Sequence, residues 1–391
     1  MNLLVNALSA TNHSGRQVIV GHLAQLLETA EPADRFVLLL HDGNRDIERA
    51  LAEELGRAPG ETLRMVAAPA LTRRWFGRAL YERLALPTLA ARLVVDRCLS
   101  ASGGWTPGLR CPQFTLALNP WALVPGGART AFDRAKAALQ RRTYRLAVLR
   151  SDGIGYGSEY MRTLYRANAG GRAERAGAIV YPALGAREAA ALDAIRGSDL
   201  PRDPLGILCA SLMAPHKNIE TLIEALRLLH EDRCVPARLR LVGGWPDPAY
   251  RRAIERRAAE SGVGEAVEIV GHLPREALRR EYRTARVYAL LSRSESFGIP
   301  SVEAQRAGTP VVAARECAAP EVCGDGGWYV AAGDAAGAAD RLCRLLTDDA
   351  AWSALSAAAV RNAARFEYRL TSRPLIALLR AARPAGSDSG T

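Results

Sequence analysis

The stretch 287–312 constrains the fold of this 391-residue chain more than any other. Its apolar run Val287–Leu291 is short enough for a buried strand, and Gly298 permits a tight turn after it. Pro300 suits the first position of a helix, where the N–H has no intrahelical partner, and Gly308 ends that helix before a second apolar run. The stretch therefore predicts strand, glycine turn, helix and strand. Such a unit leaves a positive helix end at the turn, where anions bind.

The same alternation of short apolar runs with helical periodicity extends through both halves of the chain. Strands are expected in the first half at 3–8, 36–40, 63–67, 114–118 and 178–182, and in the second half at 205–210, 239–242, 267–270, 311–313 and 328–330. Strands that alternate with helices form parallel sheets with both faces covered. The length suits two domains. The predicted class is therefore α/β, with two doubly wound Rossmann-like domains.

The domain boundaries are placed where this alternation is interrupted. Residues 1–186 are expected to form the N-terminal domain and residues 205–365 the C-terminal domain, with the polar segment 187–204 as a linker. A C-terminal helix at 366–383 is expected to pack back on the N-terminal domain. The tail 384–391 is polar and is expected to be disordered.

Charge and cysteine usage narrow the class of protein and its location. The 52 basic residues against 41 acidic ones give a net charge of +11, which predicts an anionic partner: nucleic acid, anionic lipid or a phosphorylated substrate. An arginine- and alanine-rich sequence is equally typical of a GC-rich genome. No apolar run is long enough for a membrane span, and the N-terminus is interpreted as a strand and not a signal peptide. Seven scattered cysteines without a C-x-x-C pair indicate reduced thiols in the cytoplasm and argue against a zinc site.

The topology alone predicts a ligand site in the second half. Ligands of open α/β sheets lie at the carboxyl ends of the strands. These ends bring together Lys217, Gly243, His272 and the loop 295–299. The carboxylates Glu295 and Glu303 flank the glycine turn, so the site suits a ligand that carries both phosphate and hydroxyl groups.

The motif around this turn resembles the signature of retaining glycosyltransferases of family 4. Glu295 and Glu303 are separated by seven residues, with Phe297-Gly298 between them and Gly308-Thr309-Pro310 after them. Further matches follow in the family's order: the loop of Lys217, Leu241–Gly244, Val270–Leu273 and Pro320–Val322. The resemblance is strong from about 205 to 366 and weak in the first half. It implies the GT-B fold, in which two Rossmann-like domains have a cleft between them.

The resemblance also implies roles for individual residues. Lys217 and Glu295 are the expected catalytic residues: the lysine binds the donor diphosphate and stabilises the leaving charge, and the acid contacts the donor sugar. Glu303 is expected to accept hydrogen bonds from the ribose hydroxyls. The other expected donor-binding residues are Phe297, Gly298, Ile299, Gly243, His272 and Leu273. On the acceptor side of the cleft the resemblance places Gly15, Arg16 and Asn119.

Each of these residues also has a purely structural interpretation. Lys217 is otherwise a solvated loop lysine, Glu295 an exposed loop acid, and Phe297 a core anchor. Glu303 is otherwise a first-turn acid that favours the helix dipole. Gly15 is otherwise an ordinary loop glycine with no role in ligand binding.

The sequence departs from the family pattern at two places. Many relatives carry a basic residue several positions before the lysine, where this chain has 211–213, Ser-Leu-Met. Neutralisation of the diphosphate then rests either on Lys217 with less help or on a substitute such as Arg16 or another arginine. Relatives often place a histidine where Asn119 stands. Asn119 cannot act as a base and can only orient hydroxyl groups.

The resemblance implies a retaining, metal-independent glycosyltransferase without a cofactor. The absence of an Asp-x-Asp motif fits that expectation. The donor would be a nucleotide-diphosphate sugar carrying mannose, glucose or rhamnose. The acceptor would be a saccharide or a polyprenyl-linked saccharide in bacterial cell-surface polysaccharide or lipopolysaccharide assembly.

Other functions stay open from the sequence. A non-catalytic GT-B subunit that binds a nucleotide sugar is the main alternative, and a related GT-B phosphorylase or epimerase fits less well. A nucleic-acid binder is suggested by charge alone, and no recognition module supports it. The arginine-rich helices expected at 71–94 and 130–149 fit either a peripheral contact with the anionic inner membrane or a solvated face that covers the core.

Overall fold

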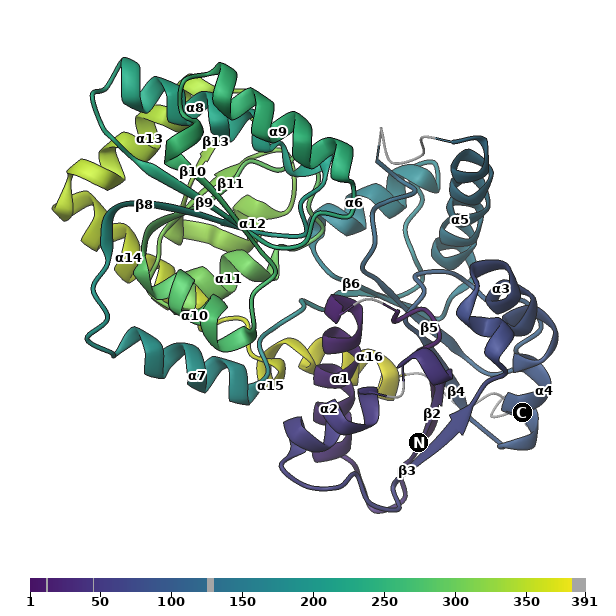
Figure 1. Cartoon of the computed structure of the whole chain (residues 1–391). Coiled ribbons are helices and arrows are strands. Elements are labelled where there is room, and N and C mark those ends of the chain that lie inside the picture. The colour runs from purple at the N-terminus through teal and green to yellow at the C-terminus, as the bar shows by residue number, and fades with distance from the viewer. Residues whose placement is uncertain (12, 45, 125–129, 382–391) are drawn as a thin grey trace. The chain divides into compact units, whose positions relative to one another are not determined.

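The protein is described by a computed structural model over residues 1–11, 13–44, 46–124 and 130–381. It divides into two compact units. The first is Met1–Gly185 with Glu367–Thr391, and the second is Ala186–Phe366. Each unit holds one parallel sheet with helices on both faces (Figure 1). The predicted α/β class is therefore confirmed.

The sheet of the first unit has the strand order β3-β2-β1-β4-β5-β6-β7, and its strands are all parallel. The strands are β1 (Asn2–Asn6), β2 (Arg35–Leu40), β3 (Leu63–Ala67), β4 (Arg97–Ser100), β5 (Gln113–Ala117), β6 (Gly153–Tyr156) and β7 (Gly177–Ile179). Leu4 of β1 lies opposite Val37 on one side and Cys98 on the other. Strand β4 lies in a segment for which no strand was expected from the sequence.

Helices cover this sheet on both faces. They are α1 (His13–Glu28), α2 (Asp46–Leu55), α3 (Trp75–Leu84), α4 (Leu86–Arg92), α5 (Ala131–Arg150), α6 (Glu159–Asn168), α15 (Tyr368–Thr371) and α16 (Arg373–Ala381), with the short 3₁₀ helices η1 (Asp42–Asn44) and η2 (Ala70–Arg73). The segment 71–94 is helical as expected, but it is divided into η2, α3 and α4. Pro87 lies in the first turn of α4, and because proline has no N–H to donate, a new helix starts there.

The sheet of the second unit has the order β10-β9-β8-β11-β12-β13 and is also parallel. Its strands are β8 (Asp203–Ala210), β9 (Arg238–Val242), β10 (Val267–Gly271), β11 (Ala285–Leu290), β12 (Val311–Ala314) and β13 (Gly327–Val330). Its helices are α7 (Ala186–Arg196), α8 (Ile219–Glu231), α9 (Pro248–Glu260), α10 (Arg275–Thr284), α11 (Ile299–Arg306), α12 (Ala319–Cys323), α13 (Ala335–Thr347) and α14 (Asp349–Ala363), with 3₁₀ helices η3 (Pro215–Lys217), η4 (Gly264–Ala266) and η5 (Gly324–Gly326). No helix among the described residues has the length and apolar character needed to cross a bilayer.

The segment 187–204 is not the linker that its polarity predicted. Most of it forms α7, whose acidic side chains are bound by arginines of neighbouring helices. Glu188 accepts two hydrogen bonds from Arg279 of α10 at 3.0 and 2.6 Å, and Asp193 accepts from Arg306 of α11 at 2.8 Å. The polar residues therefore serve packing within the second unit.

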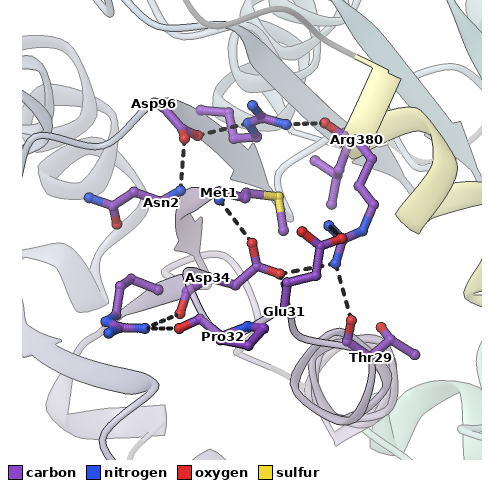
Figure 2. A network of polar contacts seen from close by, with 11 residues as sticks. Met1, Asn2, Thr29, Glu31, Pro32, Asp34, Asp96 and Arg380 are labelled. Carbon is purple, nitrogen blue, oxygen red and sulfur yellow. Dashed lines mark hydrogen bonds and ion pairs between the residues drawn. The ribbon is translucent and has the colours of Figure 1, made fainter.

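The C-terminal segment packs on the first unit through an arginine network (Figure 2). Arg380 of α16 donates to Glu31 Oε1 at 2.6 Å, to Asp34 Oδ2 at 3.0 Å and to the carbonyl of Thr29 at 3.1 Å. Asp34 is almost fully buried and also accepts a hydrogen bond from the Met1 amino group at 2.8 Å. The predicted disordered tail 384–391 lies outside the described residues.

A buried histidine joins α1 to this C-terminal segment. His22 is 2% exposed, its Nδ1 lies 2.7 Å from Ser372 Oγ, and its ring meets the edge of Tyr368 with 5.0 Å between centroids. Burial lowers the pKa of His22 to about 3. The imidazole is therefore neutral in the folded protein at any pH near neutrality.

This burial predicts a specific loss of stability in acid. The unfolded chain takes up a proton at His22 below about pH 6.5, whereas the folded chain does so only near pH 3, so the contribution of His22 is complete above pH 6.5 and falls by about 1.4 kcal/mol per pH unit below it. Urea unfolding of the wild type and of His22→Gln at pH 7 and pH 5 measures the difference. The wild type should lose more stability than the variant, and an equal loss would contradict the assignment.

Candidate functional site

Lys217 and Glu295 follow the two strands between which the strand order of the second sheet reverses. These strands, β8 and β11, are adjacent, and such a switch point opens a crevice at their carboxyl ends. Lys217 ends η3 after β8, and Glu295 lies in the loop between β11 and α11. The structure brings them into an ion pair between Lys217 Nζ and Glu295 Oε2, with side chains only 12% and 15% exposed. Lys217 is therefore not a solvated loop lysine, and Glu295 is not an exposed loop acid.

The turn that presents Lys217 is fixed by the next residue. Asn218 adopts a left-handed conformation with a φ of 59°, and its buried side chain donates to the carbonyl of Leu291, 3.0 Å away, and to that of Ala332. Its Oδ1 accepts a hydrogen bond from Thr221 at 2.9 Å. The turn is therefore tied to the end of β11, which leads to Glu295.

Gly298 forms the turn that begins α11. Its φ is 92°, a conformation that favours glycine, and no described side chain caps this helix end. Within the first turn Pro300 has no N–H, and the Ser301 N–H donates to the Gly298 carbonyl at 2.9 Å. The positive end of the helix dipole would still attract an anionic ligand such as a phosphate. Ile299 is the first residue of α11. Phe297 is 4% exposed and meets Phe366 edge-on at 5.2 Å, which confirms its interpretation as a core anchor.

Glu303 lies on α11 beyond its first turn, so the first-turn interpretation of this acid is wrong. Its side chain is 3% exposed, and each carboxylate oxygen has a partner: Arg275 Nη2 donates to Oε1 at 2.9 Å, and the Tyr282 hydroxyl donates to Oε2 at 2.7 Å. Arg275 also contacts Glu188 at 3.0 Å. A carboxylate has about four acceptor positions, and two of them are occupied here. A ligand could use the other two if the Arg275 side chain moved aside and exposed the carboxylate.

The electrostatics keep this cluster in one protonation state. Burial, followed by the Glu303 carboxylate, raises the pKa of Tyr282 well above its ordinary value, so its hydroxyl stays protonated and donates. Burial lowers the pKa of Arg275, but Glu303 and Glu188 outweigh it and raise the pKa overall. The cluster therefore holds Glu303 in a fixed position near neutral pH.

The other residues expected at the donor site in the second unit follow the ends of β9 and β10. Gly243 follows β9 with a φ of 138° and donates its N–H to Gly271 at 2.7 Å. A Cβ at this position would lie 1.8 Å from the carbonyl oxygen of Ser211, so only glycine lets the loop after β8 pass. His272 is exposed and Leu273 is half-buried, and both lie between the end of β10 and the start of α10.

The three residues expected on the acceptor side belong to the first unit. Helix α1 begins at His13, so Gly15 lies in its first turn and not in the loop before it. Arg16 donates to the carbonyl of Thr11 at 2.8 Å and pairs with Asp46. Asn119 is exposed, and its Oδ1 accepts from the Trp121 amide at 2.9 Å.

Two residues of the cluster around Glu303 were not singled out from the sequence. Arg275 and Tyr282 are both on α10, and their partner is on α11. One signal is present: Arg275 and Arg279 are four residues apart, a spacing that places both on one helix face. Both contact Glu188, but no pattern indicates which acids that face meets.

Comparison with known families identifies the second unit. The family model described as "Glycosyl transferases group 1" matches residues 193–366. This part of the chain is therefore similar to the group 1 glycosyl transferases. The match lies almost wholly in the unit that contains Lys217, Glu295 and Glu303.

Curated relatives align with the chain over about half of its length or less, and those described below are named as glycosyltransferases or mannosyltransferases. A D-inositol 3-phosphate glycosyltransferase of Corynebacterium efficiens is 34% identical over 206 residues, which are 50% of this chain and 49% of the relative. An O-antigen chain mannosyltransferase B of Escherichia coli is 31% identical over 158 residues, 40% of each chain. The chain spans about half the length of the curated relatives it matches, or less.

Solved structures with the same fold cover nearly the whole chain. Anabaena Alr3699/HepE, determined with UDP and glucose, has a TM-score of 0.68 at 17% identity and covers 98% of this chain and 100% of its own. WaaG, a glycosyltransferase involved in lipopolysaccharide biosynthesis, has a TM-score of 0.66 at 16% identity and covers 97% and 98%. These similarities confirm the predicted GT-B fold class.

Proposed function

We propose that the chain is a retaining, metal-independent glycosyltransferase of family 4. It would transfer mannose, glucose or rhamnose from a nucleotide-diphosphate sugar to a saccharide or lipid-linked acceptor in cell-surface polysaccharide or lipopolysaccharide assembly. The observation that carries the proposal is the Lys217–Glu295 pair at the strand-order switch of a group 1 glycosyl transferase domain. Two similar proteins support it: one relative is named an O-antigen chain mannosyltransferase, and one structural neighbour was determined in complex with UDP-glucose.

Each part of the site corresponds to one part of the donor in this proposal. The start of α11 and Lys217 bind the diphosphate, Glu295 faces the sugar, and Glu303 accepts hydrogen bonds from the ribose hydroxyls. In the free protein Lys217 is neutralised by Glu295. Donor binding gives the lysine a phosphate partner and frees the carboxylate for the sugar hydroxyls.

Transfer would break the bond between the anomeric carbon and the phosphate oxygen and form one between that carbon and the acceptor oxygen. The acceptor proton passes to the departing phosphate oxygen on the same face. Lys217 stabilises the negative charge that develops on that diphosphate, a contribution that grows toward the transition state. Gly15, Arg16 and Asn119 are proposed to lie near the acceptor.

Proton NMR of the product tests the stereochemistry. The one-bond coupling between the new anomeric carbon and its proton, which differs between the two anomers of glucose, mannose and rhamnose alike, should show the same configuration as the donor. An inverted product would contradict the retaining mechanism, and hydrolysis of the donor with no transfer to any acceptor would contradict the assignment as a transferase.

Metal dependence is tested with a chelator. Positive side chains and a helix terminus take the place of a cation in the proposed site, so EDTA should leave the turnover rate unchanged. Addition of Mg²⁺ or Mn²⁺ to the treated enzyme is the control. Loss of activity that either metal restores would contradict this part of the proposal.

The reaction is proposed to take place in the cytoplasm, at the face of the inner membrane. The donor is a soluble nucleotide sugar, and a polyprenyl-linked acceptor is held in the lipid. An enzyme that joins the two has to work at the boundary between them.

A further inference from the structure

The first unit exposes an apolar stripe on its outer side. Four large side chains are more than half exposed: Leu71 of η2 at 52%, and Phe76, Leu80 and Leu84 of α3 at 61%, 55% and 64%. The three on α3 are spaced by four residues, so they lie along one face of the helix. Helix α3 lies on the outside of the unit (Figure 1). A row of this kind marks an interaction surface more often than an isolated exposed leucine does.

The charges around this stripe are almost all positive. Arg74, Arg83 and Arg92 are exposed, and no acidic side chain in the described ranges lies within ion-pair distance of any of them. The single acid of α3 and α4 is Glu82. It turns inward, and its carboxylate accepts a hydrogen bond from Asn6 at 2.9 Å.

Glu82 is half-buried and faces inward, so neither α3 nor α4 places an acidic side chain on the outer face. Burial, which the hydrogen bond from Asn6 and the charge of Arg78 only partly oppose, raises the pKa of Glu82. The face formed by η2, α3 and α4 therefore presents leucine and phenylalanine side chains between arginines.

We propose that this face docks on an anionic lipid bilayer. The apolar stripe would enter the boundary between headgroups and acyl chains, and Arg74, Arg83 and Arg92 would pair with lipid phosphates. Helices that bind membranes at the interface combine such an apolar face with basic residues. The charge pattern disfavours a second copy of this chain as the occupant, because a symmetric contact would bring like-charged arginines close together.

This surface lies outside the donor site, so the proposal stands apart from the transfer reaction. It gives the proposed membrane location a specific orientation, with α3 toward the lipid. Vesicle binding needs neither donor nor acceptor. A failure of either proposal is therefore distinguishable from a failure of the other.

Co-sedimentation of the full chain with lipid vesicles tests the proposal. The wild type should bind vesicles that contain phosphatidylglycerol, bind vesicles of pure phosphatidylcholine far less, and lose binding as salt is added. Phe76→Ser with Leu80→Ser should lower the partition coefficient at least about tenfold, because each loses an apolar side chain from the interface.

A charge-matched pair of variants separates this face from general basicity. Arg74→Glu with Arg83→Glu should lower binding at least about thirtyfold, since each lost arginine contributes roughly 1 kcal/mol near an anionic surface and each new carboxylate is repelled by it. Arg252→Glu with Arg256→Glu, exposed on α9 of the second unit, makes the same change in net charge and should leave binding unchanged. All these positions are exposed, and an unchanged thermal unfolding midpoint confirms that each variant is folded.

Three results would overturn the proposal. The wild type fails to bind phosphatidylglycerol vesicles, or the Phe76 and Leu80 variant binds them as the wild type does. In the third, gel filtration shows a dimer that this variant abolishes, which would assign the stripe to a second copy.

Discussion

Replacing Lys217 by alanine is expected to lower the kcat of sugar transfer by about 10²–10³-fold, the usual effect of removing one electrostatic contact to a developing charge. The lysine is the cation in direct contact with Glu295, and both are mostly buried at the end of the switch strands. Without it, the leaving diphosphate loses its direct cationic partner in the second unit, and the positive end of α11 has to stabilise more of its charge. Initial rates at saturating donor measure the effect.

The chain offers a direct control for this variant. It contains only two lysines, and the other is Lys136 on α5, which lies over the ring of Trp121 in the first unit. Lys136→Ala should keep the wild-type rate. Near-normal turnover by Lys217→Ala would contradict the role given to the lysine.

The ion pair also predicts a separation of stability from activity. Lys217→Ala leaves Glu295 mostly buried without its partner, and an unpaired charge in that setting is destabilising. Lys217→Ala with Glu295→Ala removes both charges, so the double variant should unfold at a higher temperature than the single variant while staying inactive. A double variant less stable than either single one would contradict this account of the pair.

Replacing Glu303 by alanine should have the largest effect on stability. It removes the acceptor of the buried Tyr282 hydroxyl and one of the two acids that hold Arg275. Breaking a buried pair from one side costs about 3–5 kcal/mol, which in a domain of this size is roughly a 10 °C fall in Tm. Differential scanning calorimetry measures it.

Glu303→Gln separates the structural role from ligand binding. The amide oxygen still accepts from Tyr282, so most of the stability should be kept. The charged hydrogen bonds to the ribose are weakened, which should raise the Kd of the nucleoside diphosphate about tenfold or more. A glutamine variant that binds the nucleotide as tightly as the wild type would remove Glu303 from the donor site.

Local sequence patterns predicted most of the architecture, because apolar runs and helical periodicity depend only on residues that are close together in the sequence. It failed where polar sequence is stabilised by distant partners. Strand β4 is only four residues long and starts with Arg97, which is buried because it donates to Asp96 at 2.7 Å and to the carbonyl of Leu379. Helix α7 appeared polar for the same reason, since its acids find arginines roughly 90 to 110 residues away.

The candidate site divides in the same way. The approach of Lys217 to Glu295 follows from the rule that ligand sites form at the carboxyl ends of strands, so it was predictable without a structure. The burial of Glu303 under Arg275 was not, because it depends on how α10 packs against α11. Arg16, which was named as a possible substitute for the missing basic residue before Lys217, contacts Asp46 and Thr11 within the first unit.

The central claim is that the second unit binds a nucleotide-diphosphate sugar through Lys217 and the start of α11. Thermal unfolding of the full chain with a panel of UDP-, GDP- and dTDP-sugars tests it most directly, because a ligand that binds the folded state raises the Tm by mass action. At least one donor should raise the Tm, and its nucleoside monophosphate should raise the Tm less. In Lys217→Ala the donor should raise the Tm no more than the monophosphate does. A panel that leaves the Tm unchanged, or a shift that persists in full in Lys217→Ala, would contradict the claim.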